Sequence, residues 1–518
     1  MDSQKEEEER LVVERYLKDH GLEGTLNDFV NEVVQARPED PYVELGQRLA
    51  GASTAANSVL SLRAHQIWNG LLPALEIEIE TQQGRFTAKT CLEEDSSSVE
   101  AANNSELLAR LKGVDVTNQE AVDAALKDFP NAKVVLLASV ACCKAGAAHL
   151  GVSVQDRVAQ LAGNTSLSLP MPAITVIEGQ KEFRSIAVVP FGAGSMAEAV
   201  ELVRTLTKEL RDPKEVPKVD EEPPQEVKKK PNEKKKTTKK EAMKNVLPAS
   251  KRGEAFGALE FDDVKTLAGA VAAIRGAIER AGLEDRVALA VDVASDSFAS
   301  KSFTEEEESK TMYDLKVLDA NDDTLTVDAE GLLKTYVDVL KGTVAIATLE
   351  DPFAKDDAVG FALLKDTLEL ETLKEDDDVE TNKIGLASVG GDSKCLLQVA
   401  TSATNDLEKA DDLKCINTLS LSLSKGKTVT GCLELAKQAR ALGWGIQVNA
   451  AEAFETDESF AATLAVGLRA THLRTGGLLA NEHVAKLNEL LRIEEQGNND
   501  LLLWPGKDFR LSLLAASN

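Results

Sequence analysis

Apolar residues recur at helical spacing within the first 50 residues of the chain. The main stripe, at positions i, i+3, i+4, i+7 and i+8, consists of Leu26, Phe29, Val30, Val33 and Val34. A shorter apolar stripe over residues 11–17 precedes it, and His20-Gly21 separates the two. Asp40 is a suitable N-cap for a further helix that begins at Pro41. The pattern predicts a helical module over residues 1–50.

This short helical module cannot bury its apolar stripe within itself. Two arrangements would bury the apolar stripe. The module can pack, as an N-terminal extension, on the remainder of its own chain. Alternatively, it can pair with another protein, including a second copy of itself.

The apolar pattern changes to a period of two over residues 73–91. Three apolar residues alternate with glutamates along one stretch: Leu75, Ile77 and Ile79. Gln83-Gly84 then fits a hairpin turn. Apolar residues at helical spacing follow over residues 132–150 and 154–162. Together these patterns predict a small α+β domain over residues 62–165.

Short apolar runs alternate with helical patterns in the remainder of the chain. Eight runs predict strands: Ala173–Ile177, Ile186–Val189, Val287–Val293, Val344–Leu349, Gly385–Val389, Ile416–Leu423, Trp444–Val448 and Thr471–Leu473. Most are followed by a helical segment, and repeated β/α units at this spacing favour a β/α barrel. The predicted fold class is therefore α/β, with a TIM-like barrel over residues 171–518.

A polar segment over residues 211–252 interrupts the barrel pattern. It contains six prolines and three lysine runs but few apolar residues, so we expect an insertion without a core of its own. Three interpretations remain open: a solvated spacer, a flexible basic arm for an acidic protein partner, and a bipartite nuclear signal.

Net charge and cysteine usage exclude several classes of function. The net charge of −28 and an aromatic content of 4% oppose nucleic-acid binding. The six cysteines form no CxxC pair, so we expect reduced, mostly buried thiols. The acidic N-terminus has no apolar signal region, and no apolar stretch appears long enough to span a bilayer. These features predict a cytoplasmic protein that does not bind membranes.

Three carboxylates follow predicted barrel strands: Asp292, Glu350 and Asp392. The carboxyl ends of barrel strands converge at one face, where three acids would repel one another unless a cation lay between them. Hard oxygen ligands suit Mg²⁺. The alternative is that all three are solvated loop acids in a very acidic protein.

The amino-acid sequence around these acids resembles that of the enolase family. The resemblance covers about residues 62–510 outside the insertion, and its most specific runs are Cys-Lys-Ala-Gly-Ala-Ala (143–148), Leu-Ala-Gly-Asn (161–164), Leu-Glu-Asp-Pro-Phe (349–353), Gly-Trp-Gly-Ile-Gln-Val (443–448), Arg-Thr-Gly-Gly (474–477) and Leu-Leu-Arg-Ile-Glu-Glu-Gln (490–496). The resemblance implies an α+β cap domain followed by a β/α barrel. It also places Asp292, Glu350 and Asp392 at the family's magnesium ligands.

Several residues that the enolase reaction requires are missing. By the resemblance, Ser422 stands where the family has its lysine base, and Ala450 and Ala451 stand where it has a histidine and the phosphate-binding arginine. Ser185 replaces a glutamate, while Arg474 keeps the positive charge of a second lysine. Loss of a general base alone costs about 10² to 10⁴ in rate.

Other residues do not compensate well for these losses. Glu254 is only an approximate match for a further acid of the family. Lys394, Lys425 and Lys427 follow strands near the predicted barrel mouth, but lysines on loops seldom reach one particular proton. Gly391 and Ser393 flank Asp392 where the family has an acid and an apolar residue, so the sequence predicts weak Mg²⁺ binding at best.

The N-terminal module resembles a second family. Its Tyr-Leu, Gly-Leu and Leu-x-x-Phe-Val elements, followed by Arg-Pro-x-x-Pro-Tyr (37–42), are similar to the dimerisation/docking domain of protein kinase A regulatory subunits. The whole arrangement resembles the sperm-type, flagellar branch of enolase-like proteins. This resemblance implies a homodimer with protein partners at residues 1–50 and at the basic insertion.

Three functional hypotheses follow from the sequence. The first is an inactive or impaired phosphopyruvate hydratase homologue that serves as a docking component of a cilium or flagellum, in its axoneme. The second is an active magnesium-dependent enolase with rearranged catalytic groups. A third is a different magnesium-dependent lyase on the same barrel.

Overall fold

The computed structural model describes the chain over many short ranges: residues 15–17, 21–38, 40–52, 57–69, 72–92, 97–103, 105–179, 182–211, 251–252, 257–261, 266–303, 309–315, 326–340, 345–372, 397–402, 406–451, 456–497, 502–506 and 509. These residues divide into two compact units. One contains residues 1–65, 76–88 and 96–152, and the other contains 66–75, 89–95 and 153–518. The boundaries of the three domains expected from the sequence stay a prediction.

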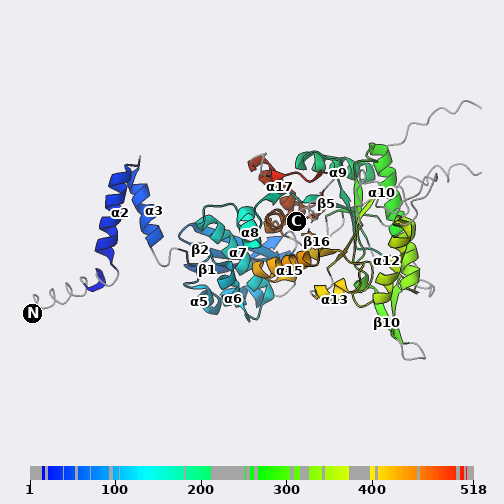
Figure 1. The fold of residues 1–518 in the computed structure, drawn as a ribbon, viewed down its shortest axis with the longest axis horizontal. Coiled ribbons are helices and arrows are strands. Elements are labelled where there is room, and N and C mark those ends of the chain that lie inside the picture. Colours follow the sequence, from blue (N-terminus) through cyan, green and yellow to red (C-terminus); the bar gives the residue numbers. More distant parts are fainter. Residues whose placement is uncertain are drawn as a thin grey trace, which may run out of the picture. The chain divides into compact units, whose positions relative to one another are not determined.

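The N-terminal helices form where the apolar pattern predicts them. Helices α2 (Leu22–Ala36) and α3 (Pro41–Ala52) pack against each other as a hairpin (Figure 1). Asp40 caps α3, because its Oδ1 accepts hydrogen bonds from the backbone N–H groups of Tyr42 (2.9 Å) and Val43 (3.2 Å). Val33 is the buried residue of α2, while other members of the stripe remain exposed.

A three-stranded sheet and several helices follow this hairpin. The strands, in spatial order, are β1 (Ser61–Asn69), β2 (Leu72–Thr81) and β3 (Gly84–Cys91). Leu75, Ile77 and Ile79 are buried, as their period-two pattern predicts. The helices are α4 (Ser97–Asn103), α5 (Ser105–Leu111), α6 (Gln119–Leu126), α7 (Ala132–His149) and α8 (Val154–Ala162).

Helix α7 corrects one expectation. It is 18 residues long and, by length and composition alone, apolar enough to cross a membrane. The sequence analysis had found no such stretch. However, 67% of this helix is buried within the protein, including Cys142 and Cys143, so α7 behaves as a core helix. Burial raises the pKa of the Cys142 thiol, which is consistent with an inert structural cysteine.

Eight strands close into a barrel. In spatial order these are β17 (His472–Gly476), β16 (Gly445–Asn449), β15 (Thr418–Leu421), β14 (Gln398–Thr401), β13 (Ile346–Glu350), β9 (Ala288–Asp292), β6 (Ser185–Val189) and β5 (Met171–Glu178). Pairing of β17 with β5 completes the closure. Strand β6 runs antiparallel to both β5 and β9, and the other neighbouring strands are parallel. The α/β barrel expected from the sequence is thus confirmed.

The unit that contains the barrel has further helices and strands besides the eight barrel strands. The helices are α9 (Met196–Arg211), α10 (Leu267–Ala281), the short 3-10 helix η1 (Ser295–Ser297), α11 (Ala329–Leu340), α12 (Ala358–Thr372), α13 (Leu407–Asp411), α14 (Leu423–Gly426), α15 (Val429–Ala441), α16 (Phe460–Gly467) and α17 (Asn481–Gln496). The strands are β4 (Leu167–Ser168), β7 (Lys251–Arg252), β8 (Leu259–Glu260), β10 (Ala299–Phe303), β11 (Ser309–Asp314), β12 (Thr326–Asp328) and β18 (Leu502–Leu503).

The fifth barrel strand differs from the prediction. Between β13 and β15 the barrel contains β14 (Gln398–Thr401), not the run at 385–389. That run and Asp392 lie outside the described residues, as does 212–250 of the insertion. The carboxyl end of the fifth strand is therefore Thr401, followed by Ser402, and the argument that placed Asp392 at this end no longer applies.

Small apolar side chains fill part of the barrel. Ala288 and Ala290 share a face of β9 with Asp292, and they pack in a buried cluster with Met171, Ala173 and Ala187. Phe509 and Phe191 belong to the same cluster. The strands are thereby held in register, so that the side chains at their ends have fixed positions.

Candidate active site

Several polar and charged side chains lie together at one rim of the barrel. The register aligns Asp292 with Glu350 on the neighbouring β9 and β13, and Ser185 at the start of antiparallel β6 with Asp292. On the opposite side of this rim, Asn449 of β16 pairs with Arg474 of β17. Asp292 and Glu350 thus lie together, as the strand-end rule predicts, and Arg474, which the resemblance had singled out, lies with them.

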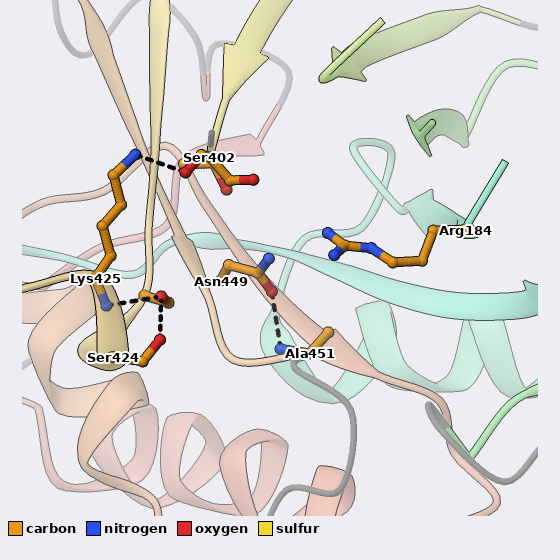
Figure 2. A pocket seen from close by; sticks show the side chains of 8 residues that line it. Arg184, Ser402, Ser424, Lys425, Asn449 and Ala451 are labelled. Atoms are coloured by element: carbon orange, nitrogen blue, oxygen red, sulfur yellow. Dashed lines mark hydrogen bonds between the residues drawn. The ribbon is translucent and has the colours of Figure 1, made fainter. Parts of the chain in front are cut away.

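A polar pocket of about 480 Å³ opens at this rim (Figure 2). Its lining consists of Arg184, Ser402, Ser420, Ser422, Ser424, Lys425, Asn449 and Ala451. A pocket of this volume can accept a small metabolite. The lining is rich in hydroxyl and amide groups, and its two charged residues are both basic.

Ser422, which the resemblance places at the position of the family's base, lies in this pocket as an N-cap. Its hydroxyl accepts a hydrogen bond from the backbone N–H of Lys425 (3.2 Å) and shares another with Ser424 Oγ (2.8 Å). The described residues place no histidine or carboxylate on this hydroxyl. Without such a partner, a serine hydroxyl does not remove a carbon-bound proton.

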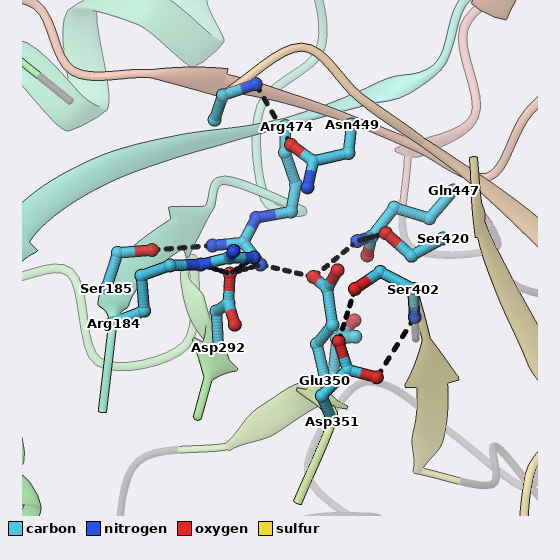
Figure 3. A network of polar contacts seen from close by, with 12 residues as sticks. Arg184, Ser185, Asp292, Glu350, Asp351, Ser402, Ser420, Gln447, Asn449 and Arg474 are labelled. Atoms are coloured by element: carbon cyan, nitrogen blue, oxygen red, sulfur yellow. Dashed lines mark hydrogen bonds and ion pairs between the residues drawn. The ribbon is translucent and has the colours of Figure 1, made fainter. Parts of the chain in front are cut away.

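A buried guanidinium joins the two strand-end carboxylates beneath the pocket (Figure 3). Arg474 has a side chain that is 2% exposed, and its Nη1 lies 3.0 Å from Asp292 Oδ2 and in close contact with Glu350 Oε2. Its Nη2 donates to Ser185 Oγ (2.7 Å). The Ser185 hydroxyl therefore supports this arginine.

A second guanidinium reaches the same cluster from the loop before β6. Arg184 donates from Nε (2.8 Å) and Nη2 (2.5 Å) to Asp292 Oδ2. Gln447 donates from Nε2 to Glu350 Oε2 (2.8 Å) and to Ser420 Oγ (3.2 Å). Each carboxylate of the pair thus has one oxygen that accepts several hydrogen bonds from the protein.

Burial and the shared guanidinium set the protonation of these acids. Burial and the neighbouring Glu350 raise the pKa of Asp292, although both arginines oppose the shift. For Glu350, burial acts upward, but Arg474 and Arg184 outweigh it and lower the pKa. Burial and Glu350 raise the pKa of Asp351 to about 6. The same two arginines thus lower the pKa of Glu350 but do not overcome the effect of burial on Asp292.

The described residues do not fit a magnesium site. Asp292 Oδ1 and Glu350 Oε1 are buried without hydrogen-bond partners among them, as free ligand atoms would be. However, the Arg474 guanidinium bridges the two carboxylates at the place where a bridging cation would bind, and Arg184 adds a second positive charge. Within the described part of the chain, no group of three metal-ligating side chains occurs.

Lys425 occupies the pocket more favourably than loop lysines usually do. Its Nζ donates to the backbone carbonyl oxygen of Ser402 (3.0 Å). Burial lowers its pKa to about 8, against opposing effects of Asp351 and Glu350. By contrast, Lys427 does not line the pocket, and Lys394 lies outside the described residues. Lys425 thus lies at the barrel mouth, where the sequence placed it, and whether its amine reaches a substrate proton stays a prediction.

The site also contains residues that the sequence analysis missed. Ser402 follows β14 and contacts Asp351 closely through its hydroxyl, while its backbone N–H donates to Asp351 Oδ1 (3.0 Å). Arg184 adjoins Ser185, a position that had already been singled out. Its charge directly before a buried strand was the signal that could have identified it. Asp392 and Glu254 lie outside the described residues, so their roles stay predictions.

Comparison with known proteins agrees with the barrel fold. The family model described as "Enolase, C-terminal TIM barrel domain" matches residues 232–512, which is more than half of the chain. The chain belongs to the enolase family. It is also 26% identical to cytosolic enolase 3 of Arabidopsis thaliana over 540 aligned residues, covering 97% of this chain and 100% of that protein.

Enolase-family membership gives the site its chemical context. Phosphopyruvate hydratases of this family generally depend on Mg²⁺ and remove a proton next to a carboxylate. In this enolase-family chain, the strand-end carboxylates Asp292 and Glu350 are paired with arginines. The family fold is therefore preserved, whereas the charge arrangement at its rim differs from a metal centre.

Proposed function

We propose that this protein is a non-catalytic member of the enolase family. The observation that carries the proposal is the Arg474 guanidinium, which lies between Asp292 and Glu350 and neutralises them internally. Enolase chemistry needs cationic stabilisation of a dianionic intermediate that the substrate forms in the pocket. A guanidinium already bound to two buried carboxylates is poorly placed to supply it.

The lining of the pocket supports the same proposal. Ser422 provides a capping hydroxyl where a base would be needed, and Ala450 and Ala451 are both buried and apolar. Loss of one general base costs about 10² to 10⁴ in rate, and such losses combine non-additively with loss of a phosphate-binding group. We therefore expect turnover to fall below detection.

One observation favours a second candidate function, that of an active phosphopyruvate hydratase. Lys425 lines the pocket, and its pKa of about 8 lies near the value that suits a general base. In this alternative, the Lys425 amine removes the substrate proton in place of Ser422. Its Nζ is hydrogen-bonded to Ser402, and it would have to turn from that carbonyl toward the substrate.

Turnover of 2-phosphoglycerate by the purified full chain distinguishes the two candidates. Formation of phosphoenolpyruvate, followed by its absorbance with excess Mg²⁺, is expected to match a protein-free blank. Lys425→Met is the informative variant, and Lys437→Met on the exposed side of α15 is its matched control. Robust turnover that Lys425→Met abolishes and Lys437→Met retains would replace the non-catalytic proposal with the active-enzyme alternative.

We also propose that residues 1–50 pair with a second copy of the chain. Several large apolar side chains of the α2–α3 hairpin are exposed: Leu26 (41%), Val30 (44%), Val34 (66%), Tyr42 (84%) and Val43 (56%). Val33 is buried, whereas its neighbours on the stripe are not. Large exposed apolar side chains on one hairpin are typical of a protein-interaction surface, and the same surface on two copies can form a two-fold interface.

A docking role in the axoneme of a cilium or flagellum completes the proposal. Its support is the resemblance of the N-terminal module to kinase-regulatory docking domains and of the whole chain to the flagellar branch. The basic insertion is proposed as a further contact for an acidic protein partner. Immunofluorescence of flagellated cells tests the location, and staining confined to the cell body would contradict it.

A further inference from the structure

Positive charge faces the pocket, while negative charge lies behind it. The charged residues of the lining are Arg184 and Lys425. Asp292 and Glu350 have side chains that are 2% and 0% exposed, and they are bound to arginines. The third acid, Asp351, is buried and accepts hydrogen bonds from Ser402. A ligand in the pocket would therefore meet the cations before any carboxylate.

The ammonium group of Lys425 has unused hydrogen-bonding capacity. It can donate three hydrogen bonds, and it donates one, to the Ser402 carbonyl. Among the described residues, no carboxylate forms an ion pair with its Nζ. A partly buried ammonium without a carboxylate is costly, so an anionic ligand would stabilise it.

The amide of Asn449 is oriented to donate into the same space. Its Oδ1 accepts a hydrogen bond from the backbone N–H of Ala451 (2.9 Å), which assigns the opposite end of the amide as Nδ2. In Figure 2 the Arg184 guanidinium extends toward Asn449. The Arg184 side chain is 38% exposed, so one face of it remains accessible from the pocket.

We infer that this pocket binds a small oxyanion, a phosphate or carboxylate group, without a divalent metal ion, through Arg184, Lys425 and Asn449. The Arg474 guanidinium behind the pocket pairs with both Asp292 and Glu350, and Arg184, which lines the pocket, also pairs with Asp292. Charge-assisted hydrogen bonds from three side chains suit an anion with several acceptor oxygens. The inference does not depend on the non-catalytic proposal, because the pocket can bind an anion whether or not the protein converts a substrate.

Lys425 gives this binding a specific pH dependence. Burial lowers its pKa to about 8, with Asp351 and Glu350 opposing, and Arg184 shares the pocket as a permanently charged neighbour. A bound anion stabilises the charged amine, so affinity decreases as pH rises through about 8. Sulfate is the suitable probe, because its charge is constant over pH 6–10. A flat sulfate profile would show that Lys425 does not contribute.

Calorimetric titration of the full chain with inorganic phosphate tests the inference directly. We expect the same affinity in EDTA and in Mg²⁺. Arg184→Gln and Lys425→Met are each expected to weaken binding about 10-fold or more, because each removes a charge-assisted hydrogen bond. Lys437→Met, at an exposed position of α15, is expected to bind as wild type does. Thermal melts of every variant establish that it is folded.

Malonate in a parallel titration distinguishes the two ligand sources. Tighter binding of phosphate supports a phosphorylated metabolite, and tighter binding of malonate supports a carboxylic acid. The inference is overturned by no binding of either anion, by binding that requires Mg²⁺, or by binding that Lys425→Met leaves unchanged. Turnover of 2-phosphoglycerate is measured separately. An active enzyme with metal-free anion binding would therefore refute only the non-catalytic proposal.

Discussion

Arg474→Gln is expected to lower the free energy of unfolding by about 3–5 kcal/mol, because it leaves two buried carboxylates without their shared cation. Arg474 is 2% exposed and contacts both Asp292 and Glu350, and it donates to Ser185. Glutamine retains part of the volume and hydrogen-bonding capacity but removes the charge. Urea unfolding monitored by circular dichroism measures the change as a lower midpoint at constant slope.

The matched control for this change is Arg204→Gln on α9. Arg204 forms an ion pair with Glu201 one turn away, but both side chains are about half exposed, at 47% and 55%. Exposed pairs contribute little, so its effect should stay within about 0.5 kcal/mol. A second change, Glu350→Gln in the Arg474→Gln background, should recover part of the loss because it removes one unpaired charge. A loss for Arg474→Gln as small as that of Arg204→Gln would show that the cluster is not held by this arginine.

The periodic patterns in the sequence were sufficient to predict most of the fold. Helix α8 has the bounds expected for it, Val154–Ala162, because Ser153 caps its start and Gly163 ends it in a left-handed conformation. Seven of the eight expected barrel runs overlap barrel strands. Such runs are readable because both faces of a barrel strand are covered, which leaves them almost entirely apolar.

The fifth strand could not be predicted in the same way. Gln398–Thr401 is a short strand with polar residues at both ends, and all four residues are buried. Gln398 Nε2 donates to Thr471 Oγ1 (3.3 Å), and its Oε1 accepts a hydrogen bond from Thr348 Oγ1 (3.4 Å). Tertiary hydrogen bonds thus make a polar residue acceptable inside the barrel. The more apolar run at 385–389 was mistaken for the strand.

The rule that strand ends meet at one rim of a barrel predicted where the site lies, but not which of its charged residues pair with one another. Asp292, Glu350 and Arg474 were all identified from the sequence as members of one site. The sequence does not reveal that the cation at Arg474 binds the two acids, because β17 and β9 are far apart in the chain and in the strand order. A pairing between such residues depends on side-chain reach across the barrel. This is also why Arg184 and Lys425 were overlooked or discounted.

Replacing two exposed apolar residues of α2 is expected to convert a dimer into a monomer. Val30→Asp/Val34→Asp places two carboxylates one turn apart on the apolar face of the α2–α3 hairpin. If that face pairs with its copy, both charges become buried in the interface, and each substitution at such a position costs on the order of 2 kcal/mol. Neighbouring sites do not add fully, so we expect dissociation to be favoured at least about 100-fold.

Sedimentation equilibrium of the full chain resolves this outcome, because one protomer weighs 55.6 kDa. Val359→Asp on α12 is the matched control, since Val359 is 66% exposed, as Val34 is, but lies on the barrel unit. The wild type and this control should both sediment as dimers, and the double variant should sediment as a monomer. A wild-type monomer, or a double variant that remains dimeric, would contradict pairing of the α2–α3 hairpin with its copy. The exposed apolar residues would then be expected to bind a different protein partner. Since the substituted valines are already solvent-exposed in the single chain, loss of the dimer without loss of thermal stability would identify the hairpin face itself as the interface.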